Sequence, residues 1–218
     1  MNIKVCGITT AKQVQQLDGL DIDFAGFIFV PDSPRYVEGK LDKKAIKNAD
    51  FDLKKVGVFI NPSYSDILDA IEDYGLDVVQ LHGEETPEFC SDLNEDVEVI
   101  KVFHIDESVK DIDALVAPYD NACDYYLFDT APTQPPPGGG GAPALKGGTG
   151  KQFDWSILAK SKIEKPFFLS GGIGVDDLAQ IKKFKHPDFY GVDINSKFET
   201  EPGVKDLAKV LQFKVGMK

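Results

Sequence analysis

The chain has 218 residues, 42% of them hydrophobic, which is enough for one substantial core or at most two small domains. Its formal net charge is −12, and such a surface repels phosphate backbones at long range and argues against nucleic-acid binding. The sequence lacks both a membrane-spanning run of about 18 apolar residues and a secretory signal. We therefore expect a soluble, cytoplasmic protein with neither nucleic acid nor membrane among its partners.

The three cysteines, Cys6, Cys90 and Cys123, are widely spaced and odd in number. They predict neither a disulfide framework nor a zinc site, and we expect no metal. A free cysteine is usually a small buried hydrophobe. Cys6 differs in position, because it lies near the end of the first apolar run, where the chain turns.

Short apolar runs recur along the whole chain, and most are β-branched or aromatic. This composition is typical of strands buried on both faces of a parallel sheet. The runs are IKVCGI (3–8), FAGFIF (24–29), KVGVFI (55–60), VVQLH (78–82), VEVIKVF (97–103), YYLFD (125–129), PFFLSG (166–171) and YGVDI (190–194).

Amphipathic segments lie between these runs and after the last one, for example at 63–75, 108–119, 176–184 and 205–215. Eight strand–helix units in 218 residues predict an α/β fold, a (β/α)₈ barrel with eight parallel strands. A doubly wound open sheet is the alternative, but it usually carries a glycine fingerprint after its first strand, and CGITT is not one.

One segment interrupts the alternation of strands and helices. Residues 131–150 read APTQPPPGGGGAPALKGGTG, rich in proline and glycine and without periodicity. The alternation resumes at once with FDWSILAKS, so we interpret the segment as a long loop after the sixth strand rather than a domain linker. The prediction is a single domain over 1–218.

Active sites of such barrels lie at the carboxyl ends of the strands. The polar residues expected there are Cys6, Arg35, Asn61, Gln80, His82, Asp129, Ser170, Gly171, Gly172, Asp193, Asn195 and Ser196. The loops after the last two strands, SGGIG and NSK, suit a phosphate, because glycines let backbone N–H groups approach an oxyanion closely. The alternative is that these glycines only make a tight turn.

Two of these residues suit proton transfer. Asp129 ends an apolar strand, where partial desolvation favours the protonated acid, although a helix-capping or ion-paired aspartate fits the sequence equally well. Cys6 is useful as a base only where positive charge or amide dipoles favour its thiolate, and taken singly it fits a core position better.

Together these segments resemble the phosphoribosylanthranilate isomerases of tryptophan biosynthesis. The resemblance runs in order from Lys4 to Asp206 through KVCGITT, GFIFVPDSPRYV, VGVFIN, VQLHGEE, VIKVF, LFDT, GGTGKQFDW, LSGGI and GVDINSKFETEPGVKD. KVCGIT and the last block are specific to this family among phosphate-binding barrels. The resemblance favours a catalytic Cys6 over a core one.

The resemblance implies an isomerase that rearranges N-(5-phosphoribosyl)anthranilate to 1-(2-carboxyphenylamino)-1-deoxyribulose 5-phosphate, an Amadori rearrangement without metal or organic cofactor. It implies that Asp129 is the general acid that protonates the ribose ring oxygen. It implies that Cys6 is the general base that removes the proton from the second sugar carbon. Each such group typically contributes about 10²–10⁴-fold in rate.

The resemblance also implies substrate-binding residues. Arg35 would meet the anthranilate carboxylate, a planar fork on a planar anion, although most loop arginines lie on the surface. His82 would contact the substrate or act as a structural hydrogen-bond partner, whereas His104 and His186 gain no role. The remaining substrate-binding residues are Gly171, Gly172, Asp193, Asn195 and Ser196.

Two features depart from the family pattern. Much of 131–146 looks inserted beside the acid, and Lys197 stands where the family commonly has glycine. Lys197 either adds a phosphate contact or distorts the cradle of amides.

Two other functions remain open at this point. An indole-glycerol-phosphate synthase-like barrel would use lysines at strand ends, and Lys101 is the inner candidate. A non-catalytic barrel that only binds a phosphosugar is the other possibility. We expect a small phosphosugar substrate as partner, and a monomer or a homodimer.

Overall fold

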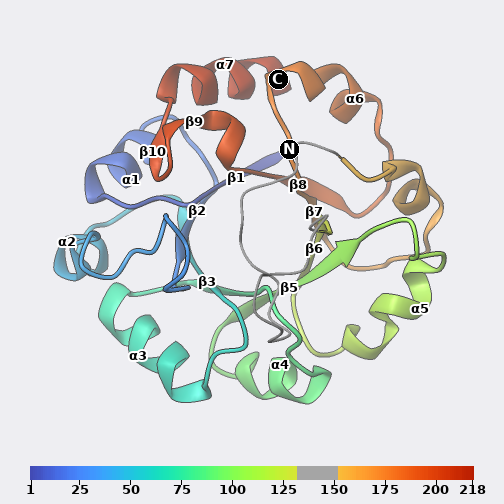
Figure 1. The fold of residues 1–218 in the computed structure, drawn as a ribbon, viewed down its shortest axis with the longest axis horizontal. Helices are drawn as coiled ribbons and strands as arrows, with labels where there is room; N and C mark the ends of the chain where they lie inside the picture. The colour runs from blue at the N-terminus through green and yellow to red at the C-terminus, as the bar shows by residue number, and fades with distance from the viewer. Residues whose placement is uncertain (132–151) are drawn as a thin grey trace.

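The computed structural model describes residues 1–131 and 152–218, and all eight predicted strands are present in it. They form a closed barrel in which every neighbouring pair is parallel and the order follows the chain (Figure 1). The strands are β1 (Asn2–Cys6), β2 (Phe24–Ile28), β3 (Lys54–Phe59), β4 (Val78–Leu81), β5 (Glu98–Ile105), β6 (Tyr125–Thr130), β7 (Phe167–Leu169) and β8 (Phe189–Ile194). The predicted barrel is therefore confirmed, and the doubly wound alternative is wrong.

The helices surround the strands as an outer ring (Figure 1). They are α1 (Ala11–Asp18), α2 (Lys43–Lys47), α3 (Tyr64–Tyr74), α4 (Pro87–Leu93), α5 (Ile112–Val116), α6 (Leu178–Lys183) and α7 (Leu207–Met217). Short 3₁₀ helices cover Ala117–Tyr119, Trp155–Lys160, Val175–Asp177 and Ser196–Phe198. Between β6 and β7 the helix of the repeat is therefore a 3₁₀ helix in the described residues.

Local sequence signals set the helix ends. Helix α3 begins after Ser63, whose hydroxyl accepts from the Asp66 N–H while the Asp66 carboxylate accepts from the Ser63 N–H. This capping box satisfies two backbone donors that the first turn leaves free. The helix ends at Gly75, which takes the left-handed conformation that a side chain disfavours.

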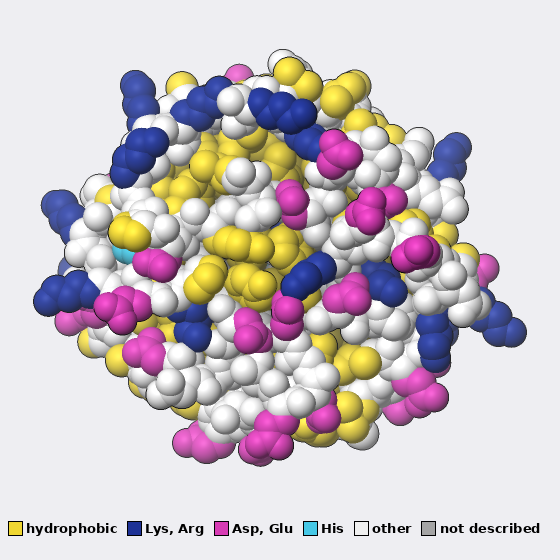
Figure 2. Space-filling view, turned by 180° about the vertical axis from the view of Figure 1, so that it is seen from behind, with side chains coloured by type: hydrophobic (Ala, Val, Ile, Leu, Met, Phe, Trp, Pro, Cys, Tyr) yellow, Lys and Arg dark blue, Asp and Glu magenta, His cyan; other side chains and the backbone are white. Residues whose placement is uncertain are grey.

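Alternation along the strands separates two apolar clusters. One lies between strands and helices, and the other fills the barrel interior with Phe24, Val56, Val78, Ile100, Val102, Leu127 and Phe168. Tyr125 and Tyr190 pack edge-on or tilted against Phe24 and Phe168 within that second cluster. Figure 2, seen from behind Figure 1, shows hydrophobic side chains at the centre of that face and charged ones around it.

The sequence did not predict a small two-stranded sheet after β8. Strands β9 (Glu199–Glu201) and β10 (Val204–Lys205) pair antiparallel outside the barrel.

The predicted loop at 131–150 lies outside the described residues except for Ala131, so that interpretation and the single domain over 1–218 stay predictions. In the described part of the chain, no helix is both long and apolar enough to cross a membrane.

Candidate active site

The predicted site residues gather at one end of the barrel. Because all strands are parallel, their carboxyl ends meet at the same rim. Cys6 ends β1, Asp129 is the second-last residue of β6, and His82 directly follows β4. The strands that carry Cys6 and Asp129 are separated around the barrel by β7 and β8.

Cys6 lies on the interior face of β1 and is only 5% exposed. It packs in a small apolar cluster with Ile28 and Val58. Lys4, two positions earlier on the same face, is fully buried, and its Nζ lies 2.9 Å from Asp193 Oδ1 on β8. The candidate base therefore stands directly above a buried ion pair that the sequence interpretation did not include.

The acidity of Cys6 reflects two opposing effects. Burial raises the pKa of its thiol, since a thiolate loses hydration in the interior, and the Lys4 and Lys205 ammonium groups oppose that rise only in part. For Lys4 itself burial lowers the pKa, but the Asp193 carboxylate and Cys6 together more than offset this and keep the ammonium charged. Positive charge therefore lies beside Cys6, but burial outweighs its effect and the pKa of the thiol stays above its ordinary value.

The candidate acid occupies a more open position. The Asp129 side chain is 22% exposed, its Oδ1 accepts the Thr130 N–H at 2.8 Å, and its Oδ2 lies 3.5 Å from His82 Nε2. Gln80 Nε2 lies 3.1 Å from His82 Nδ1, so an amide donating there leaves the His82 proton on Nε2, toward the acid. Gln80 thereby fixes the orientation of the imidazole beside Asp129.

His104 also belongs to this side of the site, although the sequence interpretation gave it no role. Its ring centroid lies 5.0 Å from that of His82, and burial lowers its pKa. The signal was available, since His104 alternates with Ile100 and Val102 on the inner face of β5. Ligand atoms of His82, His104 and Asp129 lie within 4.8 Å of one another, a grouping that could hold a metal ion. The expected absence of a metal stays a prediction.

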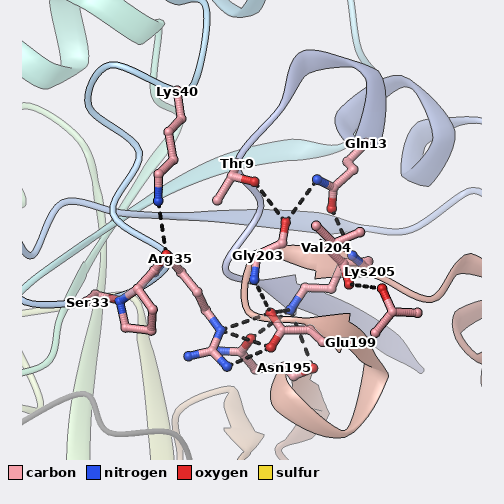
Figure 3. Close-up of polar contacts among 12 residues, drawn as sticks. Thr9, Gln13, Ser33, Arg35, Lys40, Asn195, Glu199, Gly203, Val204 and Lys205 are labelled. Atoms are coloured by element: carbon pink, nitrogen blue, oxygen red, sulfur yellow. Dashed lines mark hydrogen bonds and ion pairs between the residues drawn. The ribbon is translucent and has the colours of Figure 1, made fainter.

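Arg35 is not a surface arginine. It is 6% exposed, and its Nε and Nη2 donate to the Glu199 carboxylate at 2.9 and 2.6 Å (Figure 3). Lys205 Nζ donates to the same carboxylate at 2.7 Å and to Asn195 Oδ1 at 2.7 Å. Burial works against ionisation of Glu199, but the hydrogen bonds from Arg35 and Lys205 hold its pKa below the ordinary value.

The β9–β10 hairpin positions this cluster. Its turn residue Gly203 accepts hydrogen bonds from Thr9 Oγ1 and Gln13 Nε2, and the Lys205 N–H donates to Gln13 Oε1 (Figure 3). The hairpin is therefore tied to the segment after β1, and it brings Glu199 and Lys205 to Arg35. Sequence reasoning missed both residues, although they lie in the family-like block after β8.

The candidate anion site lies at the loops after β7 and β8. Gly171 and Gly172 have φ of +91° and +67°, which side chains disfavour, and an added Cβ on Gly171 would lie 2.2 Å from Thr130 Oγ1. Among the described residues, no acceptor is found for the N–H groups of Gly172 and Ser196. These donors suit the predicted phosphate. Lys197 lies beside this loop, with its Nζ 3.7 Å from Asp177 Oδ2.

Lys101, predicted as an inner residue, faces outward, so that prediction is wrong. It alternates with Val99 and Phe103, which pack between strands and helices, and its Nζ is bonded to Glu85 Oε2 and the Gly83 carbonyl. The register of β5 places Ile100 and Val102 inside instead. The synthase-like alternative thus loses its candidate lysine.

A closed parallel barrel with Cys6, Asp129 and Arg35 at its carboxyl rim has the architecture of an enzyme of the (β/α)₈ class. Residues 3–214 match the family model described as N-(5'-phosphoribosyl)anthranilate (PRA) isomerase. The chain is 40% identical over 215 residues to the N-(5'-phosphoribosyl)anthranilate isomerase of Parabacteroides distasonis, with 98% of this chain and 91% of the relative covered. It belongs to the phosphoribosylanthranilate isomerase family.

Solved structures agree with this assignment. The phosphoribosyl anthranilate isomerase from Thermotoga maritima matches all of this chain and 98% of its own, with a TM-score of 0.81 and 29% identity. A phosphoribosyl anthranilate isomerase in complex with reduced 1-(o-carboxyphenylamino)-1-deoxyribulose 5-phosphate matches with the same coverages, a TM-score of 0.79 and 28% identity. The family and fold predicted from the sequence are confirmed.

Proposed function

We propose that this protein catalyses the Amadori rearrangement of N-(5-phosphoribosyl)anthranilate, with Asp129 as general acid and Cys6 as general base. The observation that carries the proposal is the meeting of these two groups at the carboxyl rim of one closed barrel. A protonated carboxyl group and a thiolate supply the two transfers that the reaction needs.

The acid acts first. Asp129 donates a proton to the ribose ring oxygen, the bond from that oxygen to the first carbon breaks, and the nitrogen lone pair forms the C=N bond of an iminium ion. The partial exposure of Asp129 lets the carboxyl group recover a proton between turnovers. His82 faces the carboxyl group through its Nε2 and contacts the substrate beside it.

The base acts second. Cys6 removes the proton from the second carbon, and the electron pair of that C–H bond forms a C=C bond while the C=N electrons neutralise the nitrogen. The enolamine then loses the hydroxyl proton and gains one at the first carbon, which gives the ketone. Proton transfers balance every step, so the proposal requires no cofactor.

Substrate binding uses the two remaining regions of the rim. The Nη1 edge of Arg35, which makes no hydrogen bond within residues 1–131 and 152–218, meets the anthranilate carboxylate while Glu199 holds the other edge. The N–H groups around Gly172 and Ser196 hold the phosphate. Asp193, Asn195 and Gly171 support these contacts, since the Asp193 and Asn195 side chains are bonded to Lys4 and Lys205.

The test is a fluorescence assay with freshly prepared phosphoribosylanthranilate. Anthranilate fluorescence should fall in proportion to enzyme concentration, and mass spectrometry should identify carboxyphenylamino-deoxyribulose phosphate. A purified, folded protein that binds the reduced product analogue without turnover would be the non-catalytic barrel. Conversion of the product itself to an indole would support the synthase-like alternative.

A cytoplasmic location and a monomeric or homodimeric state stay predictions.

A further inference from the structure

The residue that the mechanism leaves unexplained is Lys4. It lies two positions before Cys6 on the inner face of β1, has no exposed surface, and contacts Asp193 through a 2.9 Å ion pair. A buried ion pair contributes little net stability compared with apolar packing, because both ions lose their hydration. A lysine directly beneath the candidate base therefore calls for a functional explanation.

The lack of a side chain at Gly26 leaves a small space that both Lys4 Nζ and Cys6 Sγ border. Cys6 is the register partner of Gly26 on β2. A Cβ added to Gly26 would lie 2.9 Å from Cys6 Sγ and 3.1 Å from Lys4 Nζ, so any side chain would displace both atoms. The absence of a side chain at this position is what allows the ammonium group and the sulfur to border the same space.

The buried charges around Cys6 favour one further negative charge. They comprise three cations and two anions, contributed by β1, the loop after β2, β8, β9 and β10: Lys4, Arg35, Lys205, Asp193 and Glu199. Uncompensated charge is costly in an interior. In the substrate-free protein, an ionised Cys6 brings this group to neutrality.

Lys4 is better placed than the other cations to supply the compensating charge. Arg35 and Lys205 both donate to Glu199. In the described part of the chain Lys4 has a single charged hydrogen-bond partner, Asp193, and an ammonium group carries three donors, which leaves donors for a thiolate. Among the charges that lower the pKa of Cys6, that of Lys4 is the strongest.

We propose that Lys4 is a positioning residue for the base: its ammonium group, anchored by Asp193, holds the ionised Cys6 sulfur, and Gly26 leaves the space that this contact needs. The inference rests on the proposed function, in which Cys6 removes the proton. It assigns the Lys4–Asp193 pair to the chemistry rather than to stability.

The test measures the pH dependence of Cys6 alkylation by iodoacetamide, peptide by peptide, in the substrate-free protein. Lys4→Gln keeps a hydrogen-bond donor for Asp193 but removes the charge, so the alkylation profile should move to higher pH by at least about one unit, a tenfold loss of rate near neutrality. Lys4→Arg should restore most of that rate. Gly26→Ala keeps every charge and should shift the profile in the same direction as Lys4→Gln.

The matched control is Lys101→Gln. Lys101 is also a buried lysine paired with one carboxylate, Glu85, but it faces the helices rather than Cys6. It should lose comparable stability and leave the Cys6 profile unmoved. Unshifted profiles in folded Lys4→Gln and Gly26→Ala would overturn the inference. Full activity of Cys6→Ser would instead overturn the role of Cys6 as base in the proposed function. The alkylation profiles do not depend on turnover, so the two failures can be told apart.

Discussion

The two sides of the barrel mouth are built in different ways. On the acid side, Asp129 is partly exposed, accepts one backbone N–H and lies beside the imidazoles of His82 and His104. On the base side, Cys6 is buried beside two groups of ion-paired side chains. They are the Lys4–Asp193 pair and the cluster of Arg35, Glu199 and Lys205. The Asp129 carboxyl group is therefore in contact with solvent, whereas the Cys6 thiol is largely shielded from it.

This difference matches the demands of the two steps. An acid that protonates an oxygen must be reloaded in each cycle, and access to water provides the proton. A thiol that removes a proton from carbon must be both desolvated, so that it is strongly basic, and charged, which desolvation opposes. The adjacent cations oppose the effect of desolvation in part. The following variants test whether the two sides of the barrel mouth act independently.

The largest effect is expected from Asp129→Asn. The amide keeps the shape of the carboxyl group but cannot deliver a proton, so turnover should fall by about 10²–10⁴-fold. Affinity for the reduced product analogue, measured by calorimetry, should stay within a few-fold of the original. Near-normal turnover would remove Asp129 from the mechanism.

The corresponding change on the base side is Cys6→Ser, which should lose at least about 10²-fold in turnover because a hydroxyl is a far weaker base. The control is Cys90→Ser, since Cys90 is also buried but lies on α4, away from the mouth. Steady-state kinetics and thermal unfolding of both variants separate the roles. Equal activity of the two variants would make Cys6 a core residue.

Glu199→Gln tests whether the ion cluster anchors Arg35. Leaving Arg35 and Lys205 without their shared carboxylate should cost about 3 kcal/mol of unfolding free energy and raise KM. The folded pKa of Glu199 is depressed, so its contribution is present above the unfolded pKa of about 4.3 and is lost as the pH falls through the folded value. The stability difference from the unsubstituted protein should therefore narrow in acid.

Glu85→Gln is the control for that variant. Glu85 is also a buried carboxylate paired with a lysine, but it lies outside the Arg35 cluster. It should lower the denaturation midpoint without raising KM. A KM increase of the same size in both variants would show that Glu199 acts only through stability.

Gly172→Val probes the phosphate loop. The side chain is strained at a φ of +67° and should disturb the amide cradle, so KM should rise by about tenfold with a smaller change in kcat, as for a lost contact that binds substrate and transition state alike. Gly39→Val is the matched control, because Gly39 has a φ of +76° with no atom near an added Cβ. Inorganic phosphate should inhibit competitively, and normal phosphate binding by Gly172→Val would contradict the assignment.

The sequence predicted the barrel well because each strand is a continuous apolar run whose pattern depends on its own residues. It placed Cys6 and Asp129 at the barrel mouth for the same reason, since both lie at or near the ends of such runs. Their catalytic roles came from the family resemblance and stay predictions. The ion clusters were missed because they join residues far apart in the chain: Lys4 with Asp193, and Arg35 with Glu199. Lys101 was misplaced because a lysine in an apolar run does not reveal which face of the strand it occupies.

The smallest effect concerns the relative reactivity of the three thiols. Burial raises the pKa of Cys90 to about 11 and that of Cys123 to about 12, and neither lies at the barrel mouth. Burial also raises the pKa of Cys6, but the adjacent cations oppose it and the thiol lies where substrate must reach. Iodoacetamide should therefore modify Cys6 several-fold faster than the other two, and the reduced product analogue should protect it alone. Peptide-resolved mass spectrometry with and without the analogue measures both effects. Equal alkylation rates for all three thiols would mean that the cations beside Cys6 do not activate its thiol. Equal protection of all three would mean that the analogue does not bind at Cys6.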